Sequence, residues 1–236
     1  MSITRLTTLL CTALFSINFA IASVQISSTR IIYDGKEKDV SIQVNNSGSY
    51  PVLLQSWVDD GNPDAKPENV RVPFFLTPPL TRVNSHAGQT LRLTFVGPNL
   101  PQDRESVYWL NILEIPPVTN KQENQIQVAF RSRIKIFYRP EALNAQAANE
   151  AGAEVRWSQQ GSNIILSNPT PYYISAVSIG VEQNGKKFMI PADMLAPKGS
   201  AKFTLPQSVK LDASSAVSIE FINDYGAVVK KRLQNN

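Results

Sequence analysis

The chain has 236 residues, of which 42% are hydrophobic and 18% are charged. This composition excludes a wholly disordered chain, which would be poor in hydrophobic residues and rich in charge. The formal net charge is +4, and no run of five or six like charges occurs. Scattered charges of this kind indicate a solvated surface, so we expect no nucleic acid as a partner.

Residues 1–22 have the features of a secretory signal peptide. Arg5 precedes a mostly apolar stretch from Leu6 to Ala22, which ends in Ala20-Ile21-Ala22, the small-residue pattern at a cleavage site. A membrane anchor is the alternative, but polar residues interrupt the stretch and it is short for a span of about 20 apolar residues. We therefore predict cleavage after Ala22 and a mature chain outside the cytoplasm, without membrane insertion.

The chain contains one cysteine, Cys11, and one histidine, His86. A Cys/His zinc site needs several ligands, and a Ser–His or Cys–His catalytic pair would have to use His86, so we expect no metal site and no such enzyme. His86 lies in Asn84-Ser85-His86-Ala87-Gly88, which is typical of an exposed turn. Cleavage would remove Cys11, so the mature protein must rely on its hydrophobic core rather than on disulfides.

Short segments rich in Val, Ile, Phe and Tyr follow each other with turn residues between them, which predicts an all-β chain. The strands predicted in the first half are Val24 to Tyr33, Val40 to Asn45, Val52 to Val58, Gln89 to Val96, Val107 to Ile115 and Ile126 to Tyr138. Those predicted in the second half are Val155 to Trp157, Asn163 to Leu166, Ile174 to Val181, Lys202 to Leu205, Ala216 to Ile222 and Val228 to Leu233. Prolines around Phe74 to Leu76 predict an edge or broken strand there, and Asn184-Gly185 predicts a hairpin.

The stretch from Glu141 to Gly152 is rich in Ala and Asn and lacks strand character, so we interpret it as a linker with at most a helical turn. It divides the mature chain into two β domains, residues 23–143 and residues 144–236. Each has the size of an ordinary β-sandwich.

The predicted strand from Ile126 to Tyr138 is unusual because a period-2 pattern of mostly apolar and mostly polar positions holds over thirteen residues. Typical strands have about five or six residues. A long core strand is the plain interpretation. The functional one is an edge strand that lends its apolar row to a partner by β-strand addition.

The segment from Leu100 to Pro116, together with Ile134 to Pro140, closely resembles the PapD-like periplasmic pilus chaperones of the chaperone–usher pathway. Further matches, in the family's order, are Thr29 to Gly35, Thr77-Pro78-Pro79 and Ile222 to Gly226. The resemblance covers essentially the whole mature chain. It implies two immunoglobulin-like sandwiches in an L-shaped, boomerang arrangement with a cleft between them, a periplasmic location and no enzymatic activity.

The resemblance also implies roles for particular residues. Ile126, Val128 and Phe130 match the donor-strand side chains that fill the groove of an incomplete pilus subunit. Arg30 and Lys135 match the two basic residues that bind the subunit's C-terminal carboxylate. Glu105, Arg139 and Asp224 match an interdomain charge cluster, and Thr77-Pro78 matches a position where relatives have a cis peptide bond.

The loop before the donor strand is short, Val118 to Gln125, and the mature chain lacks the cysteine pair of the long-loop branch, so the sequence resembles the short-loop, FGS-type branch. The implied partners are pilus (fimbrial) subunits and an outer-membrane usher, and exposed donor strands would let free chaperones cap each other. No phosphate-binding loop of the G-x-x-x-x-G-K-[ST] type occurs, so we expect no ATP and no cofactor.

Two other functions stay open from the residues alone. A secreted β-sandwich binding module, such as a sugar-binding adhesin domain, would place its site on loops and gives no reason for Arg30 and Lys135 to meet. A hydrolase with a carboxylate pair is formally open because acidic residues are plentiful, but no spacing selects a pair.

Overall fold

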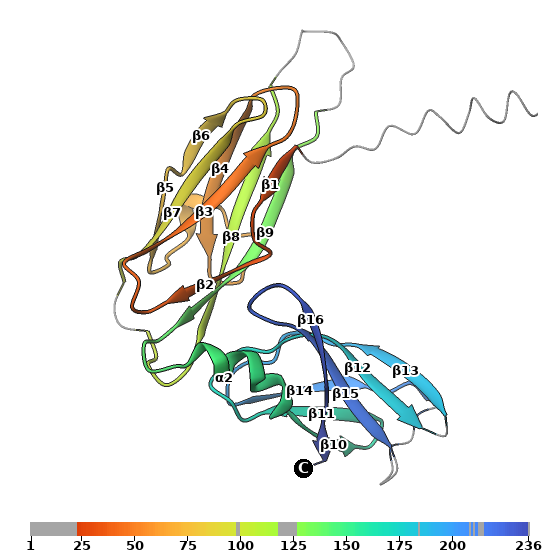
Figure 1. Ribbon diagram of the computed structural model, residues 1–236. Coiled ribbons are helices and arrows are strands. Elements are labelled where there is room, and N and C mark those ends of the chain that lie inside the picture. Colours follow the sequence, from red (N-terminus) through yellow and green to blue (C-terminus); the bar gives the residue numbers. More distant parts are fainter. Residues whose placement is uncertain are drawn as a thin grey trace, which may run out of the picture.

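A computed structural model of the chain describes residues 23–97, 100–117, 127–183, 185–207, 209, 211 and 215–235. These residues form two β-sandwiches that meet at an angle (Figure 1). The first sandwich contains strands β1 to β9 and the second contains β10 to β17. The predicted signal peptide, residues 1–22, lies outside the described residues, as do the loop from Val118 to Gln125 and Ile126.

The first sandwich consists of a four-stranded and a five-stranded sheet. The four-stranded sheet has the order β1 (Val24–Ile26), β3 (Asp39–Asn46), β7 (Gly88–Phe95) and β5 (Phe74–Thr77). The five-stranded sheet has the order β2 (Arg30–Asp34), β9 (Phe130–Arg139), β8 (Ser106–Ile115), β4 (Val52–Asp59) and β6 (Leu80–Val83). A short 3-10 helix, η1 (Pro67–Asn69), follows β4. β2 and β9 pair in parallel, whereas the other paired strands of this sandwich are antiparallel.

The second sandwich consists of two four-stranded sheets. One has the order β14 (Gly199–Thr204), β11 (Asn163–Asn168), β10 (Arg156–Gln160) and β17 (Gln234–Asn235). The other has the order β13 (Lys186–Pro191), β12 (Ser175–Gln183), β15 (Ala216–Ile222) and β16 (Val228–Arg232). Helix α2 (Ala145–Glu150) and the 3-10 turn η2 (Ala151–Ala153) connect the two sandwiches, within the stretch interpreted as a linker. Asn144 caps α2, because its side chain accepts hydrogen bonds from the amides of Gln146 and Ala147.

Each sandwich has its own apolar core, which follows from the alternation of buried and exposed residues along the strands. In the first core, Tyr33 stacks on Tyr138 with ring centroids 5.8 Å apart, and the edge of Phe74 meets Tyr33 at 5.5 Å. The Tyr33 hydroxyl donates to the Lys38 carbonyl and accepts from the Phe95 amide. This arrangement fixes β2 and the last part of β9, the two strands that carry the predicted carboxylate-binding residues.

Two predicted strands differ from the structure. The segment from Val24 to Tyr33 is two strands in different sheets, because Ser27-Ser28-Thr29 lets the chain cross from β1 to β2. The predicted strand from Ile126 begins at Phe130, which pairs with Glu114 near the end of β8. In the same register Ile115, the last residue of β8, lies opposite Ala129, so the residues before Ala129 have no β8 residue to pair with.

Candidate functional site

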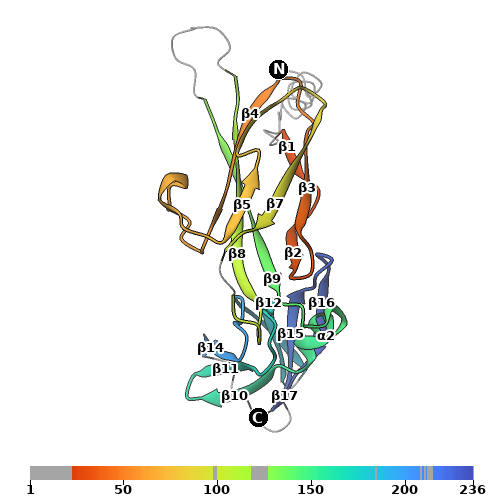
Figure 2. The same ribbon diagram turned by 90° about the vertical axis from the view of Figure 1, so that its left-hand side faces the viewer.

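The candidate site lies where β9 runs from the far end of the first sandwich to its junction with the second (Figure 2). Ile136 and Tyr138 are buried in the core of the first sandwich. The alternate residues Lys135, Phe137 and Arg139 therefore face outward, toward the second sandwich. Phe137 contacts Tyr173 of the second sandwich, with ring centroids 5.9 Å apart.

Arg30 and Lys135 are register partners in the parallel pairing of β2 with β9. Neighbouring strands lie about 4.8 Å apart, and register partners point to the same face of a sheet. The pairing therefore brings the two predicted basic residues side by side on the outward face. Both side chains are partly buried.

The second sandwich orients Arg30. Its Nη1 donates to the Ile222 carbonyl at 2.9 Å and to Ser175 Oγ at 3.2 Å. Its Nε is buried and has no hydrogen-bond partner among the described residues. Burial lowers the pKa of Arg30, although Asp224 opposes the shift. The site thus holds a partly desolvated cation whose buried Nε donor is unused.

Burial also lowers the pKa of Lys135, and the neighbouring charges of Arg30 and Arg133 add to this effect while Asp193 opposes it. No carboxylate lies within ion-pair distance of Lys135 in the part of the chain that the structure describes. A pair of partly desolvated cations without a bound counter-charge favours an anion, and a carboxylate can accept a charge-assisted hydrogen bond from each.

Two residues of the predicted donor row are described by the structure: Val128, which lies just before β9, and Phe130, which begins it. Val128 is 55% exposed and Phe130 is 40% exposed, although both are large apolar residues. β2 pairs with β9 only from Lys135 to Arg139. From Phe130 to Ile134, β9 therefore has β8 on one side and no strand on the other among the described residues. The free edge ends at the Arg30–Lys135 pair.

The predicted charge cluster joins the two sandwiches. Arg139 Nε donates to Glu105 Oε1 at 2.8 Å, and its two Nη atoms donate to the Asp224 carboxylate at 2.9 and 3.2 Å. Glu105 Oε2 also accepts from the Tyr173 amide at 2.8 Å. The side chains of Arg139 and Glu105 are 5% and 2% exposed, so the cluster is an interior link between the sandwiches rather than a ligand-binding surface.

A second polar cluster beside the site was not predicted. Arg133 of β9 donates to both carboxylate oxygens of Asp59, at 3.0 and 2.5 Å, and lies over the Trp109 ring at 4.8 Å. Asn111 Nδ2 donates to Asp59 Oδ2 at 2.6 Å. This cluster pairs Arg133, two residues before Lys135, with a carboxylate and connects β9 to β8 and β4. In the sequence, Trp109, Asn111 and Arg133 lie on predicted strands and Asp59 directly follows one, and nothing in the sequence connects the four.

The other predicted features lie away from this site. The Thr77–Pro78 peptide bond is cis, between β5 and β6. His86 is exposed and lies in a turn with a φ of 55°. The residues that the structure describes contain no group of metal-ligating side chains and no helix long and apolar enough to cross a membrane.

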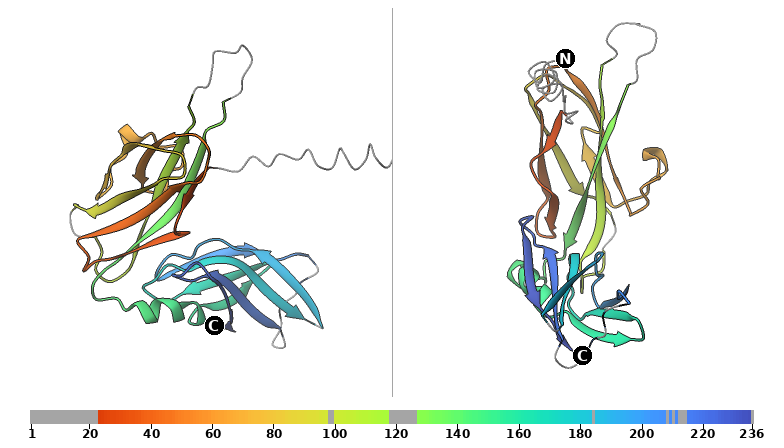
Figure 3. Two further views of the ribbon diagram at one scale, coloured as in Figure 1. Left: turned by 45° about the horizontal axis from the view of Figure 1, so that its top comes forward. Right: turned by 90° about the vertical axis from the view of Figure 1, so that its right-hand side faces the viewer.

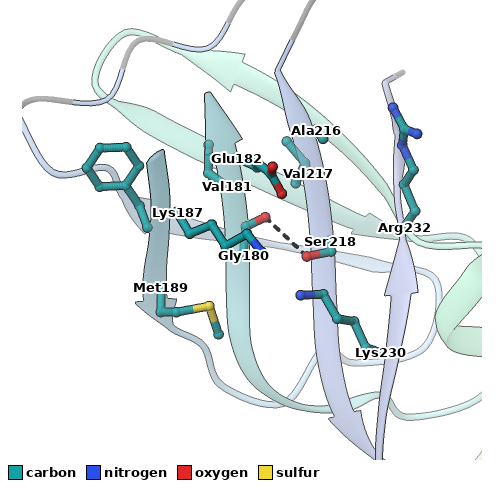
Figure 4. A pocket seen from close by; sticks show the side chains of 11 residues that line it. Gly180, Val181, Glu182, Lys187, Met189, Ala216, Val217, Ser218, Lys230 and Arg232 are labelled. Carbon is teal, nitrogen blue, oxygen red and sulfur yellow. Dashed lines mark hydrogen bonds between the residues drawn. The ribbon is translucent and has the colours of Figure 1, made fainter. Parts of the chain in front are cut away.

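A separate hollow of about 400 Å³ lies on the outer face of the second sandwich (Figure 4). Gly180 and Ser218 form its floor, and Met189, Lys230 and Arg232 lie around it. Ser218 and Arg232 pair several residues before and after the turn that carries Asp224. The hollow is thus distinct from the Arg30–Lys135 site, and its cations offer controls for that site.

Comparison with known families decides between the open functions. Residues 23–144 match the family model "Pili and flagellar-assembly chaperone, PapD N-terminal domain", and residues 150–233 match "Pili assembly chaperone PapD, C-terminal domain". The chain belongs to the PapD-like family of pilus-assembly chaperones. It is therefore a chaperone for pilus subunit assembly and not an enzyme.

Individual relatives cover nearly the whole chaperone. It is 38% identical to the probable fimbrial chaperone YadV of Escherichia coli K12, over 96% of each chain, and 40% identical to the chaperone protein FimB/FhaD of Bordetella pertussis, over 88% and 86%. The crystal structure of the CupB2 chaperone of Pseudomonas aeruginosa matches with a TM-score of 0.77 and 34% identity, over 90% of this chain and all of that one. The SafB chaperone of Salmonella enterica, solved with the SafA pilin, matches with a TM-score of 0.76 and 25% identity, over 92% and 98%.

Proposed function

We propose that this chaperone caps pilus subunits in the periplasm by adding the edge of β9 to the subunit's incomplete sandwich. The observation that carries the proposal is the register of Arg30 with Lys135 at the point where the free edge of β9 ends. Exposed apolar side chains before this point and a pair of cations at it form one continuous surface. A sugar-binding module or a hydrolase gives no reason for this combination.

The geometry sets the direction of the bound strand. A subunit strand that ends in a carboxylate at Arg30 and Lys135, and that pairs with Phe130 to Ile134, must run toward Lys135. It therefore runs parallel to β9 and in line with β2, which takes over as the neighbour of β9 from Lys135 onward. The anchor would thus fix the register, which backbone hydrogen bonds alone leave free to slip.

Val128 and Phe130 supply the apolar contacts in this proposal. Full burial of a Val or Phe side chain contributes about 1.5–3 kcal/mol, and the net gain is smaller because association and ordering oppose it. Ile126, which continues the same row, lies outside the described residues, and its insertion is proposed from the alternation of the sequence alone.

The location and the later steps belong to the same proposal. The signal-peptide features of residues 1–22 and the family of the chain support a mature protein in the periplasm. There the chaperone would deliver subunits to an outer-membrane usher, where a segment of the next subunit replaces β9. Chaperones without a subunit can cover their exposed rows by pairing with one another.

The test is co-expression with candidate fimbrial subunits from neighbouring genes. Copurified subunit is measured for wild type, Lys135→Ala, Arg30→Ala and the control Arg232→Ala, which removes a cation from the hollow on the second sandwich. We expect wild type and the control to recover subunit and the two anchor variants to recover little.

Thermal melting of each chaperone alone separates binding from folding. Lys135→Ala is the more decisive variant, because Arg30 also hydrogen-bonds to the second sandwich. Normal subunit capture by a normally folded Lys135→Ala chaperone contradicts the proposed anchor and the register built on it.

A further inference from the structure

The carboxylate of Glu114 faces inward at the rim of the core of the first sandwich, next to Phe130, where the free edge of β9 begins. Glu114 is 8% exposed, and its neighbours in register are Leu54 on β4 and Phe130 on β9. No cation lies within ion-pair distance of it among the described residues. A buried carboxylate without a counter-charge is costly unless hydrogen bonds compensate.

The hydrogen bonds to Glu114 come from the residues that follow the predicted cleavage site. The Ser23 hydroxyl donates to Glu114 Oε1, and the Val24 amide donates to Oε2 at 3.1 Å. β1 begins at Val24 in the four-stranded sheet, whereas Glu114 belongs to the five-stranded sheet. The contact therefore connects the two sheets of the first sandwich at the end where the free edge of β9 begins.

Ser23 is held firmly in this position. Its carbonyl accepts hydrogen bonds from the amide and the hydroxyl of Ser47, at 2.8 and 2.9 Å. Gly48 lies so close that a Cβ atom there would meet the Ser23 Cβ at 2.6 Å. The nitrogen of Ser23 is three bonds from its own Oγ and one residue before the Val24 amide, and both of these groups donate to the Glu114 carboxylate, so an ammonium group at Ser23 would be within a few ångströms of it.

We propose that Glu114 is the binding site for the α-ammonium group that cleavage after Ala22 creates at Ser23. This inference rests on the secretion step of the proposed function. A signal peptidase adds water across the Ala22–Ser23 peptide bond: the hydroxyl goes to the Ala22 carbonyl carbon and the hydrogen to the Ser23 nitrogen. At neutral pH the new amine takes up a proton and the new Ala22 acid releases one. The counter-charge that Glu114 lacks thus forms only in the processed chain.

The pairing has a definite pH signature. An α-amino group ordinarily titrates at a pKa of about 7.7–8.0, and a carboxylate beside it raises that value in the folded state. The ammonium–Glu114 pair contributes its full stabilisation at pH values below the ordinary pKa of the amine. This stabilisation is lost as pH rises through the raised pKa of the amine in the folded state. The described residues in contact with Glu114 or paired with it are Ser23, Val24, Leu54 and Phe130, and none of their side chains titrates near this pH.

The experiment uses chaperone purified from the periplasm. Mass spectrometry establishes the first residue, and the pH dependence of the ¹³C shifts of Ser23 gives the pKa of the amine. We expect a chain that starts at Ser23 and an amine pKa at least about 1 unit above 7.7–8.0. In Glu114→Gln the amine should return to its ordinary pKa, whereas the exposed control Glu154→Gln should keep the raised value.

A second measurement covers the case in which Glu114→Gln does not fold. A chain with one extra Gly before Ser23 moves the ammonium away from Glu114, and it should melt at a lower temperature than wild type at pH 7 and at the same temperature above pH 10. A chain that starts elsewhere, an ordinary amine pKa in wild type or an unchanged melting temperature overturns the inference. Subunit capture by the same wild-type preparation tests the proposed function separately.

Discussion

If Lys135 binds the subunit's terminal carboxylate as proposed, subunit binding depends on pH. Burial and the nearby cations lower its pKa below 10.5, whereas a bound carboxylate favours the charged form, so binding and protonation strengthen each other. We expect the affinity for a peptide that carries the subunit's C-terminus to be constant at neutral pH and to fall as pH rises through the lowered pKa. Titrations between pH 7 and pH 10.5 measure this. Lys135→Arg stays charged throughout and should give a flat profile; an equally flat wild-type profile contradicts the assignment.

Asp59 should make the stability of the folded chaperone depend on pH in the acidic range. Burial opposes its ionisation, but hydrogen bonds from Arg133, Asn111 and the Gly61 amide outweigh burial and lower its pKa. The Asp59 carboxylate therefore contributes its full stabilisation above its ordinary pKa of 3.8. This stabilisation is lost as pH falls through the lower pKa of the folded state. We expect Asp59→Asn to unfold at lower urea concentration at pH 7 and the difference to shrink toward pH 2. The exposed neighbour variant Asp60→Asn should follow wild type at every pH, and a constant deficit in Asp59→Asn contradicts the linkage.

At the scale of the strands, two adjacent residues just before β9 allow a test of which side chains face the subunit. Val128 and Ala129 are both exposed but lie on opposite sides of the chain in an added strand. We expect Val128→Asp to weaken subunit binding more than tenfold, because a charge replaces a contact worth about 1.5–3 kcal/mol. Ala129→Asp should bind nearly as wild type. The dissociation constant for the subunit is measured for both variants. An equal loss of affinity in the two variants means that Val128 does not face the subunit.

Alternation of apolar and polar residues predicted most strands because both sandwiches bury one face of every sheet. β15 has the predicted bounds, Ala216–Ile222, and the turn after it contains Asn223 to Gly226 as expected. The crossing of the chain between β1 and β2 was missed because it leaves the alternation almost intact. The start of β9 depends on where β8 ends, which is a tertiary property that the pattern of β9 itself does not contain.

For the candidate site, too, the sequence pattern predicted some features, and others depend on the tertiary structure. Periodicity indicates that Val128 and Phe130 share a face, but the register that brings Arg30 beside Lys135 joins strands far apart in the sequence. Only the family resemblance pointed to that pair. The Asp59–Arg133 ion pair had no signal of its own, because a charged residue on an outward face is ordinary until its partner is known.

For the whole molecule, the two sandwiches meet at an angle (Figure 3). The proposed anchor depends on this angle, because Arg30 comes from the first sandwich and donates hydrogen bonds to the second. The turn between β15 and β16 lies against the first sandwich. Gly226 has a φ of 82°, and a Cβ there would meet Thr29 Oγ1 at 2.7 Å. The same turn carries Asp224, which binds Arg139. The junction thus holds Arg30 and the interior cluster together.

Arg139 carries two ion pairs of this junction, to Glu105 and to Asp224. Removing one member of a buried ion pair costs about 3–5 kcal/mol because the other charge is left unpaired. We expect Arg139→Gln to be destabilised by about this amount at pH 7 and to show a wider spread of interdomain angles by small-angle X-ray scattering. Arg131→Gln, which removes an exposed arginine from the same strand, should match wild type in both measurements.

The pH dependence of the Arg139→Gln deficit identifies its cause. Burial already raises the pKa of Glu105, against the opposing charge of Arg139. Without Arg139 the pKa rises further, and the buried acid stays protonated to higher pH. A raised acid pKa makes the folded state relatively more stable at low pH, so the deficit should be smallest near pH 4 and grow toward pH 7. Adding Glu105→Gln should remove this pH dependence and restore part of the stability. If the deficit in Arg139→Gln is the same at pH 4 and pH 7, lost packing rather than the unpaired Glu105 is responsible, and the cluster does not hold the junction by charge.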